Sequence, residues 1–152
     1  MTNNSFTLQR LYFPRIEGIY IKDPGKDAEY NQAFRIALVV ESDNKIKLLF
    51  GMSISSHLKE GDSPLAGCVI EIMADIDLSN PLVNPLTDLN QVPLLPNMLA
   101  LLYPFIREKV NYYFSNNHML LLLPPVNTYE IIKDLVSTGG PALEILDKRS
   151  AK

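Results

Sequence analysis

The sequence predicts an α+β fold, a four-stranded antiparallel sheet covered by one long and one short C-terminal helix. The first half of the chain holds runs in which apolar and polar residues alternate, and short polar connections separate these runs. The second half instead repeats apolar residues at helical spacing. Because short connections join antiparallel neighbours and a sheet with one apolar face must be covered, the helices are expected to lie on that face.

The first predicted strand covers residues 6–13, where large apolar residues alternate loosely with polar ones. Pro14 has no backbone N–H to donate within a sheet, so the strand is expected to end there, to bulge there, or to lie at an edge. Gly18 and the cluster at 22–26, which contains Asp, Pro and Gly, predict a turn-rich connection to the next strand.

The second and third predicted strands form a hairpin. Residues 31–41 are rich in branched and aromatic side chains, and residues 46–55 place Ile46, Leu48, Phe50, Met52 and Ile54 on one face against mostly polar or small residues on the other. The residues between them, Ser42-Asp43-Asn44, are typical of a turn.

The fourth predicted strand, residues 66–78, has the clearest alternation in the chain. It follows a polar connection at 57–64 and places six apolar residues on one face, while Glu71, Asp75 and Asp77 lie on the other. The apolar face comprises Cys68, Ile70, Ile72, Ala74, Ile76 and Leu78. Residues 79–90 are predicted to form a loop.

A long helix is predicted to begin near Pro96 and to end at the polar residues 115–118. Its apolar residues recur every three or four positions and form one stripe. Leu101, Phe105 and Tyr112 are also apolar but lie off that stripe. The helix is therefore expected to cover the sheet and a second surface as well. The stripe comprises Leu95, Leu99, Leu102, Ile106, Val110 and Tyr113.

A second helix is predicted from Asn127 to Val136, because Asn127 followed three residues later by Glu130 resembles a capping arrangement. The glycine pair at 139–140 is expected to end it. Pro141 is expected to start one more helical turn, and residues 147–152 are expected to form a frayed polar tail. That turn would carry Leu143, Ile145 and Leu146.

The chain length of 152 residues fits a single domain, residues 1–152, with an ordered core from about residue 5 to about residue 146. The net charge of -3, without a basic block, argues against nucleic acid and anionic membranes as partners. Cys68 is the one cysteine, which excludes an internal disulfide. The sequence shows no signal peptide, and prolines interrupt its longest uncharged run. A cytoplasmic protein without membrane insertion is expected.

Catalysis is not expected, and neither are a cofactor or a metal site. His57 and His118 lie in predicted polar loops without further metal ligands at suitable spacing. Cys68 lies on an apolar strand face, where a small buried residue is expected instead of an activated thiolate. A solvated acidic face is the preferred interpretation of Glu71 and its neighbours, over a catalytic carboxylate pair.

Surplus apolar surface remains after the sheet and the helix stripe have covered one another, and such patches mark association sites. The link at 120–125 either packs in the core or lines a groove for a client, and the residues favour neither. Predicted client-binding residues are Leu101, Phe105, Tyr112, Leu121, Leu122 and Tyr129. Predicted contacts between copies of the chain are Phe6, Leu8, Leu102, Phe105 and Ile106.

Three blocks resemble the SecB export chaperone family, in the same order along the chain. The first is Phe6-Thr7-Leu8-Gln9-Arg10-Leu11-Tyr12, which resembles the opening strand of that family. The second comprises Pro96-Asn97-Met98-Leu99 and Tyr103-Pro104-Phe105-Ile106-Arg107-Glu108, on the main helix. The third is Leu123-Pro124-Pro125-Val126-Asn127, before the last helix. The resemblance extends over about residues 5–136.

This resemblance implies a homo-oligomer, either a dimer or a tetramer built as a dimer of dimers. It also implies an ATP-independent holdase, which binds unfolded or precursor polypeptides for protein export and hands them to SecA for translocation. Two alternatives stay open: a SecB-like adaptor or chaperone associated with a toxin–antitoxin pair, and an oligomeric interaction protein without holdase activity. An unrecognised enzyme ranks well behind these.

Overall fold

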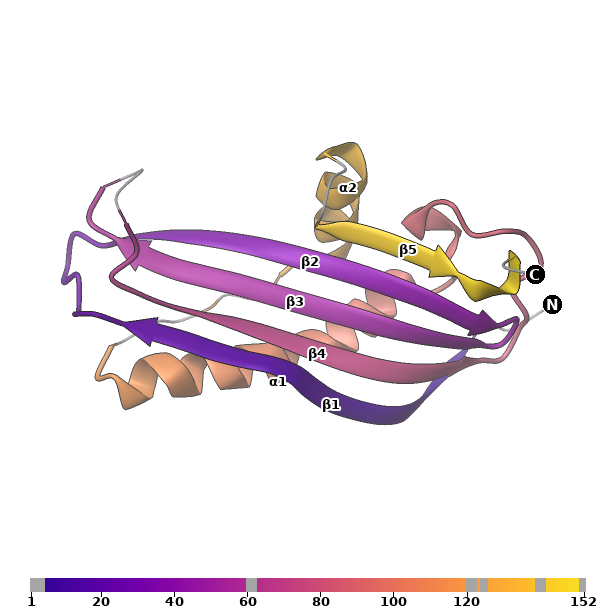
Figure 1. Ribbon diagram of the computed structural model, residues 1–152, viewed down its shortest axis with the longest axis horizontal. Helices are drawn as coiled ribbons and strands as arrows, with labels where there is room; N and C mark the ends of the chain where they lie inside the picture. Colours follow the sequence, from indigo (N-terminus) through magenta and orange to yellow (C-terminus); the bar gives the residue numbers. More distant parts are fainter. Residues whose placement is uncertain (1–4, 60–62, 120–122, 124–125, 139–141, 151–152) are drawn as a thin grey trace.

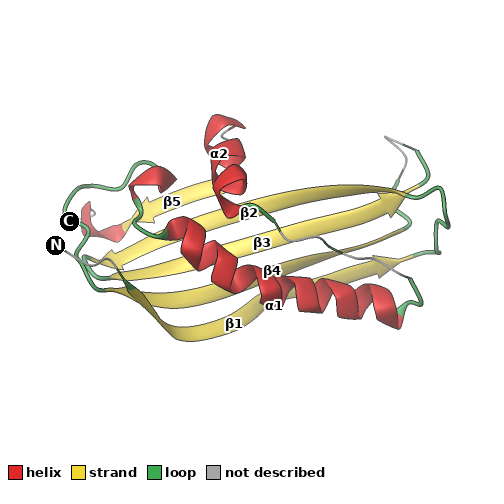
Figure 2. Ribbon diagram, turned by 180° about the vertical axis from the view of Figure 1, so that it is seen from behind, coloured by secondary structure: helices red, strands yellow, loops and turns green. Residues whose placement is uncertain are grey.

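The computed structural model describes residues 5–59, 63–119, 123, 126–138 and 142–150. Five strands form one sheet in the order β1-β4-β3-β2-β5, and both helices lie on the same side of it (Figures 1 and 2). The elements are β1 (Phe6–Tyr20), β2 (Glu29–Ser42), β3 (Lys45–His57), β4 (Ala66–Leu78), the 3-10 turn η1 (Leu89–Gln91), α1 (Leu95–Asn116), α2 (Thr128–Thr138), β5 (Leu143–Asp147) and the 3-10 turn η2 (Lys148–Ser150).

The class and the helical cover agree with the prediction, but the sheet has five strands and is mixed instead of four-stranded and antiparallel. β5 pairs in parallel with β2 over Ile36–Val40, where a helical turn after Pro141 was expected. The backbone N–H of Ile36 donates to the carbonyl oxygen of Ala142 at 2.9 Å. A run of five residues is too short to distinguish the period of 2 in a strand from the period of about 3.6 in a helix. Its conformation is therefore decided by pairing with the open edge of β2.

Residues 147–150 are held in place, in contrast to the expected frayed tail. The guanidinium group of Arg149 lies 2.7 Å from Asp147 and 3.2 Å from Asp43, and it donates to the carbonyl oxygens of Leu82 and, at 3.0 Å, Asn84. This guanidinium holds the pKa of the Asp147 carboxyl well below its usual range. The charged end of the chain therefore ties β5 to the β2–β3 turn and to the loop after β4.

β1 continues through Pro14 to Tyr20, and it is an edge strand. Its register with β4 shifts between Leu8 and Arg10 and again between Tyr12 and Arg15. The expectation that Pro14 marks an edge or a bulge is confirmed. The expected connection at Gly18 is wrong, because Gly18 pairs with Cys68 within the sheet.

Residues opposite one another on neighbouring strands share a face of the sheet, so the register defines two faces. The face toward the helices, here called the inner face, is apolar and fully buried at its centre, as in the row Ala74, Leu48 and Leu38. The opposite, outer face carries most of the charged strand residues. The predicted alternation of β2, β3 and β4 is thus confirmed.

α1 lies across the inner face, and its predicted stripe is buried there except for Tyr113, which is half-buried (Figure 2). Pro96 occupies the first turn, as expected, where a missing N–H leaves no hydrogen bond unmade. Pro104 lies inside the helix, and Figure 2 shows the axis changing direction along its length. The buried residues are Leu95, Met98, Leu99, Leu102, Tyr103, Ile106, Val110 and Phe114.

α2 begins with the cap that the sequence predicts. The side-chain oxygen of Asn127 accepts hydrogen bonds from the backbone N–H groups of Tyr129, at 3.0 Å, and Glu130, at 3.3 Å. The hydroxyl of Thr128 donates to the carbonyl oxygen of Pro96 at 2.9 Å. The start of α2 is therefore fastened to the first turn of α1.

Candidate functional site

One flank of α1, beside its buried stripe, carries Leu101, Phe105 and Tyr112, here called the outer stripe. The spacings of four and seven residues place all three on one side of the helix. Their exposed fractions are 44%, 41% and 66%, whereas Leu102 and Ile106 on the sheet side are at 1% and 0%. α1 thus carries exposed apolar side chains outside its buried stripe, and these three predicted client residues share one side of the helix.

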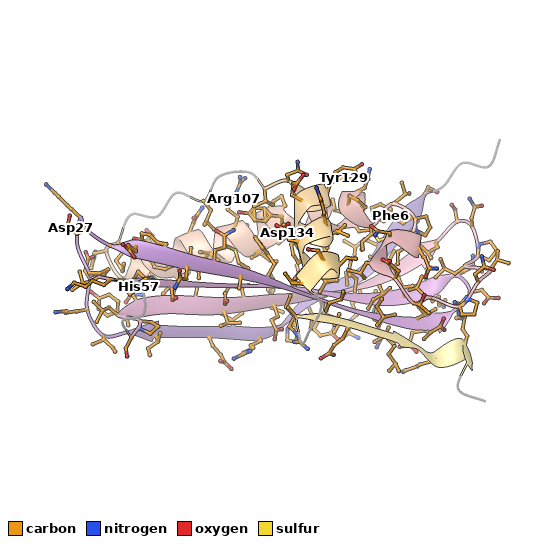
Figure 3. All side chains as sticks on the ribbon, turned by 90° about the horizontal axis from the view of Figure 1, so that it is seen from above. Phe6, Asp27, His57, Arg107, Tyr129 and Asp134 are labelled. Atoms are coloured by element: carbon orange, nitrogen blue, oxygen red, sulfur yellow. The ribbon has the colours of Figure 1, made fainter. Side chains whose placement is uncertain are left out.

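The remaining predicted client residues lie on or near α2. Tyr129 is 68% exposed, and Figure 3 shows it on the helix side of the sheet, as it does Arg107 of α1. Because Thr128 binds the first turn of α1, Tyr129 adds to the apolar surface of the helical layer. Leu121 and Leu122 lie outside the described residues.

The predicted contacts between copies divide into two groups. Phe6 and Leu8 are half-buried against the core at the start of β1, and Phe105 is exposed on the outer stripe. Leu102 and Ile106, however, are fully buried beneath the chain's own sheet. These two residues therefore cannot form an interface while the chain keeps this fold, because the stripe that carries them packs inward.

The end of β1 adds apolar surface that the sequence analysis missed. Ile16 lies opposite Ile70 and Tyr20 opposite Ala66, so both residues are on the inner face. They are nevertheless 56% and 45% exposed. The available signal was the alternation of Ile16, Gly18 and Tyr20, which was overlooked because Gly18 was assigned to a turn.

Gly18 lies between these two residues and receives Tyr113 of α1. A Cβ atom at Gly18 would be only 2.2 Å from Cε2 of the Tyr113 ring. The Tyr113 hydroxyl donates to the carbonyl oxygen of Ile19, and the ammonium of Lys109 lies 5.2 Å from the centre of the Phe13 ring. These contacts seat the C-terminal half of α1 on β1, so the outer stripe and the exposed end of β1 lie on the same side of the sheet.

The outer face of the sheet is not the solvated acidic face that was expected. Glu71 is only 7% exposed, and its carboxylate lies 2.8 Å from Arg35 and 4.0 Å from Arg15. Gly51, opposite Glu71 on β3, leaves room for this side chain, whose Cγ would be 3.2 Å from a Cβ there. A hollow of about 530 Å³ lies over this pairing. Glu71 is thus an ion-paired group between two arginines.

The two histidines and the cysteine lie in three different surroundings. His57 is 2% exposed at the end of β3, with Nδ1 2.6 Å from the carbonyl oxygen of Lys59, so it is not a solvated loop histidine. His118 is exposed in the turn after α1. Burial raises the pKa of the Cys68 thiol to about 12, which keeps it protonated. Within the described ranges, no three His, Cys, Asp or Glu side chains are grouped to hold a metal ion.

Neither helix in the described part of the chain is both long enough and apolar enough to cross a membrane.

Comparison with known proteins gives a structural likeness without a sequence match. No protein-family model and no curated protein matches the chain. The solved structure of the Mycobacterium tuberculosis Rv1957 SecB-like chaperone, in complex with a ChAD peptide from the Rv1956 HigA1 antitoxin, superimposes with a TM-score of 0.61. The match covers 80% of this chain and 89% of that chain, at 15% sequence identity.

A crystal structure of a protein of unknown function from Streptococcus agalactiae gives a TM-score of 0.45 at 7% identity, over 81% of this chain and 100% of that chain. This second likeness supports no inference. The first shows that the chain has a SecB-like fold, as the residue blocks in its first strand, long helix and last link predicted.

Proposed function

We propose that the chain is an ATP-independent holdase that binds unfolded polypeptide through the outer stripe of α1 and the end of β1. The observation that carries this proposal is the exposure of large apolar side chains on a SecB-like fold whose core is otherwise closed. Leu101, Phe105 and Tyr112 are between 41% and 66% exposed on α1, and Ile16 and Tyr20 continue the surface on β1. Exposed large apolar side chains on one side of a fold mark a site for a binding partner.

The shape of this surface fits a client without a fixed shape. Its side chains come from a helix and a strand instead of from the walls of one pocket. A partner that arrives unfolded is best held by many weak apolar contacts, because a single shaped pocket would select one sequence. Tyr129 extends the surface toward α2. Leu121 and Leu122 stay predicted client residues.

Association of the chain with itself draws on the same residues. We propose a homo-oligomer, a dimer or a tetramer, in which Phe105 and the start of β1 meet a second copy. Replacing Phe105 with Glu places a charge in that contact, so the mass measured by light scattering should fall toward that of one chain. Unchanged mass together with an unchanged melting temperature would contradict this interface.

Two leucines of similar exposure allow a matched test of the client surface. Leu101 on the outer stripe is 44% exposed, and Leu146 on the outer face of the sheet is 55% exposed. Neither Leu101→Ser nor Leu146→Ser should change the melting temperature by more than about 3 °C, because exposed substitutions cost about 0.5 kcal/mol or less. Only Leu101→Ser should weaken suppression of aggregation and speed client release. Equal effects of the two variants would show that the outer stripe is not the client surface.

A specialised client is the second candidate. The Rv1957 structure holds a peptide from an antitoxin, so a chain of the same fold is a candidate chaperone for one such partner. Co-purification from the native cell separates the possibilities: a mixture of precursors with SecA supports an export role, and one stoichiometric antitoxin supports the specialised role. An oligomer that leaves unfolded protein to precipitate at equimolar ratio supports an adaptor without holdase activity.

A further inference from the structure

The two edges of the sheet differ in how they are protected against pairing with another strand. The β1 edge carries Pro14, two register shifts and the charged residues Arg10 and Arg15. Prolines, bulges and charges are the devices by which natural edge strands avoid added strands. The β2 edge is covered by β5, but only over Ile36–Val40.

The first part of β2, residues 29–33, therefore leaves its outer backbone groups unpaired. The N–H of Ile36 points to β5, because it donates to Ala142. Backbone direction alternates along a strand, so the N–H and C=O of Tyr30 and Gln32 point the same way. No group within the described residues is recorded as bonding to them on that side, and both residues are exposed.

The residues of this open segment carry none of the protecting devices seen on β1. The sequence Glu29-Tyr-Asn-Gln-Ala33 contains no proline and no lysine, and Glu29 is its one charged residue. Its pairing with β3 is continuous from Glu29 to Val40, without a shift in register. The open segment is thus a regular edge that an added strand can extend.

We propose that residues 29–33 of β2 accept an extended segment of the polypeptide client as an added strand. The inference deepens the proposed holdase function and rests on it. β5 already shows that the β2 edge takes an extended chain, and only a second backbone satisfies alternating N–H and C=O groups along a strand. Backbone pairing does not depend on sequence, which suits a binder of many clients.

Tyr30 supplies the apolar part of this site. It lies on the inner face, is 39% exposed, and its ring packs edge-on against Phe114 of α1 at 6.4 Å. Every second side chain of an added strand would lie on this same face, beside Tyr30. A client segment that alternates apolar and polar residues is therefore the best fit. An uncharged segment should bind better than an acidic one, because Glu29 repels carboxylates.

The substitution Gln32→Pro tests the proposal, with Gln32→Ala as its control. Proline removes the outward N–H of residue 32, and it is tolerated on an edge strand where that N–H faces away from the sheet. Alanine removes the same side chain but keeps the N–H. The probe is reduced, carbamidomethylated α-lactalbumin, which stays unfolded and gains no charge at its blocked cysteines. Its dissociation constant should rise about tenfold with Gln32→Pro and less than twofold with Gln32→Ala.

Amide hydrogen exchange of the unmodified chain gives a second measurement that needs no variant to fold. The probe should slow exchange at Tyr30 and Gln32, and leave the outward amides of β1 ahead of Pro14 unchanged. Equal binding by both variants without slowed exchange overturns the inference while the holdase function stands. If exchange at Tyr30 and Gln32 slows as the protein concentration rises in the absence of probe, the edge pairs with a second copy of the chain. That outcome also overturns the inference. If the unmodified chain binds no probe, the proposed function itself fails.

Discussion

The contact between Gly18 and Tyr113 offers a sharp test of how α1 is seated on the sheet. A methyl carbon at Gly18 would lie 2.2 Å from Cε2 and 2.8 Å from Cδ2 of the Tyr113 ring. Carbon atoms that are not bonded prefer separations of about 3.5–4.0 Å, so Gly18→Ala must displace the ring by roughly 1.5 Å or turn it outward. The backbone at Gly18 is not left-handed, which means that alanine brings no backbone strain of its own.

The energy follows from what the ring loses when it moves. The hydrogen bond from the Tyr113 hydroxyl to Ile19 contributes about 0.5–1.5 kcal/mol. The edge-on contact with Phe114, at 5.2 Å between ring centres, contributes a similar amount. The two contacts together lose about 2 kcal/mol. Replacing glycine with alanine in a strand offsets about 0.5–1 kcal/mol of this loss. Gly18→Ala should therefore lower the free energy of unfolding by about 1 kcal/mol.

A double-mutant cycle with Tyr113→Ala isolates this contact. Without the ring, only the strand preference remains, so Gly18→Ala should now stabilise the chain by about 0.5–1 kcal/mol. The change of sign corresponds to a coupling of about 2 kcal/mol between the two positions. Urea unfolding of the four proteins at one fixed concentration measures it, because self-association makes stability depend on concentration. If Gly18→Ala stabilises the chain equally with and without Tyr113, the reasoning is refuted.

Three further outcomes are expected for the C-terminal tie and the core. Arg149→Leu should cost roughly 1–2 kcal/mol of unfolding free energy, because it removes the cation beside the Asp147 carboxylate, whose side chain is 9% exposed and keeps its backbone hydrogen bonds, whereas Lys148→Leu, at an exposed pair, should stay within about 0.5 kcal/mol in the same urea titration. Because the pKa of Asp147 is depressed in the folded chain, its ion pair contributes fully to the free energy of unfolding above the ordinary aspartate pKa, and contributes less as the pH falls. The difference in unfolding free energy between the unmodified chain and Asp147→Asn should therefore shrink from about pH 5 to about pH 2. A difference that stays constant over this range would contradict the expectation. Cys68, buried and with a raised pKa of about 12, should react with a thiol reagent at pH 8 only as fast as the chain opens, so fast reaction of the folded chain would disprove its burial.

The sequence alone determined the elements whose side chains repeat with a clear period. β4 was predicted at its observed bounds, β2 and β3 within two residues at either end, and the start of α1 within one. These elements have one buried face each, and burial imposes a period of 2 on a strand and about 3.6 on a helix. The Asn127 cap was equally readable, since it depends on residues within one helical turn.

Long-range pairing decided the elements and groups that the sequence did not predict. The run Leu143–Asp147 became a strand because β2 offered an unpaired edge, and that edge is more than a hundred residues away in the chain. Arg149 became a fixed group because the loop at 82–86 and Asp43 reach it. Glu71 became an ion-paired residue because Arg35 lies across the glycine on β3.

The candidate site shows the same division within a single helix. Spacing separated Leu101, Phe105 and Tyr112 from the buried stripe, and their exposure agrees with that separation. It did not show that Leu102 and Ile106 would be fully covered, nor that Ile16 and Tyr20 would extend the surface from β1. Apolar composition measures how much surface must be covered, but which residues stay exposed depends on where α1 crosses the sheet, and that position is set by side chains such as Tyr113 and the gap left for it at Gly18.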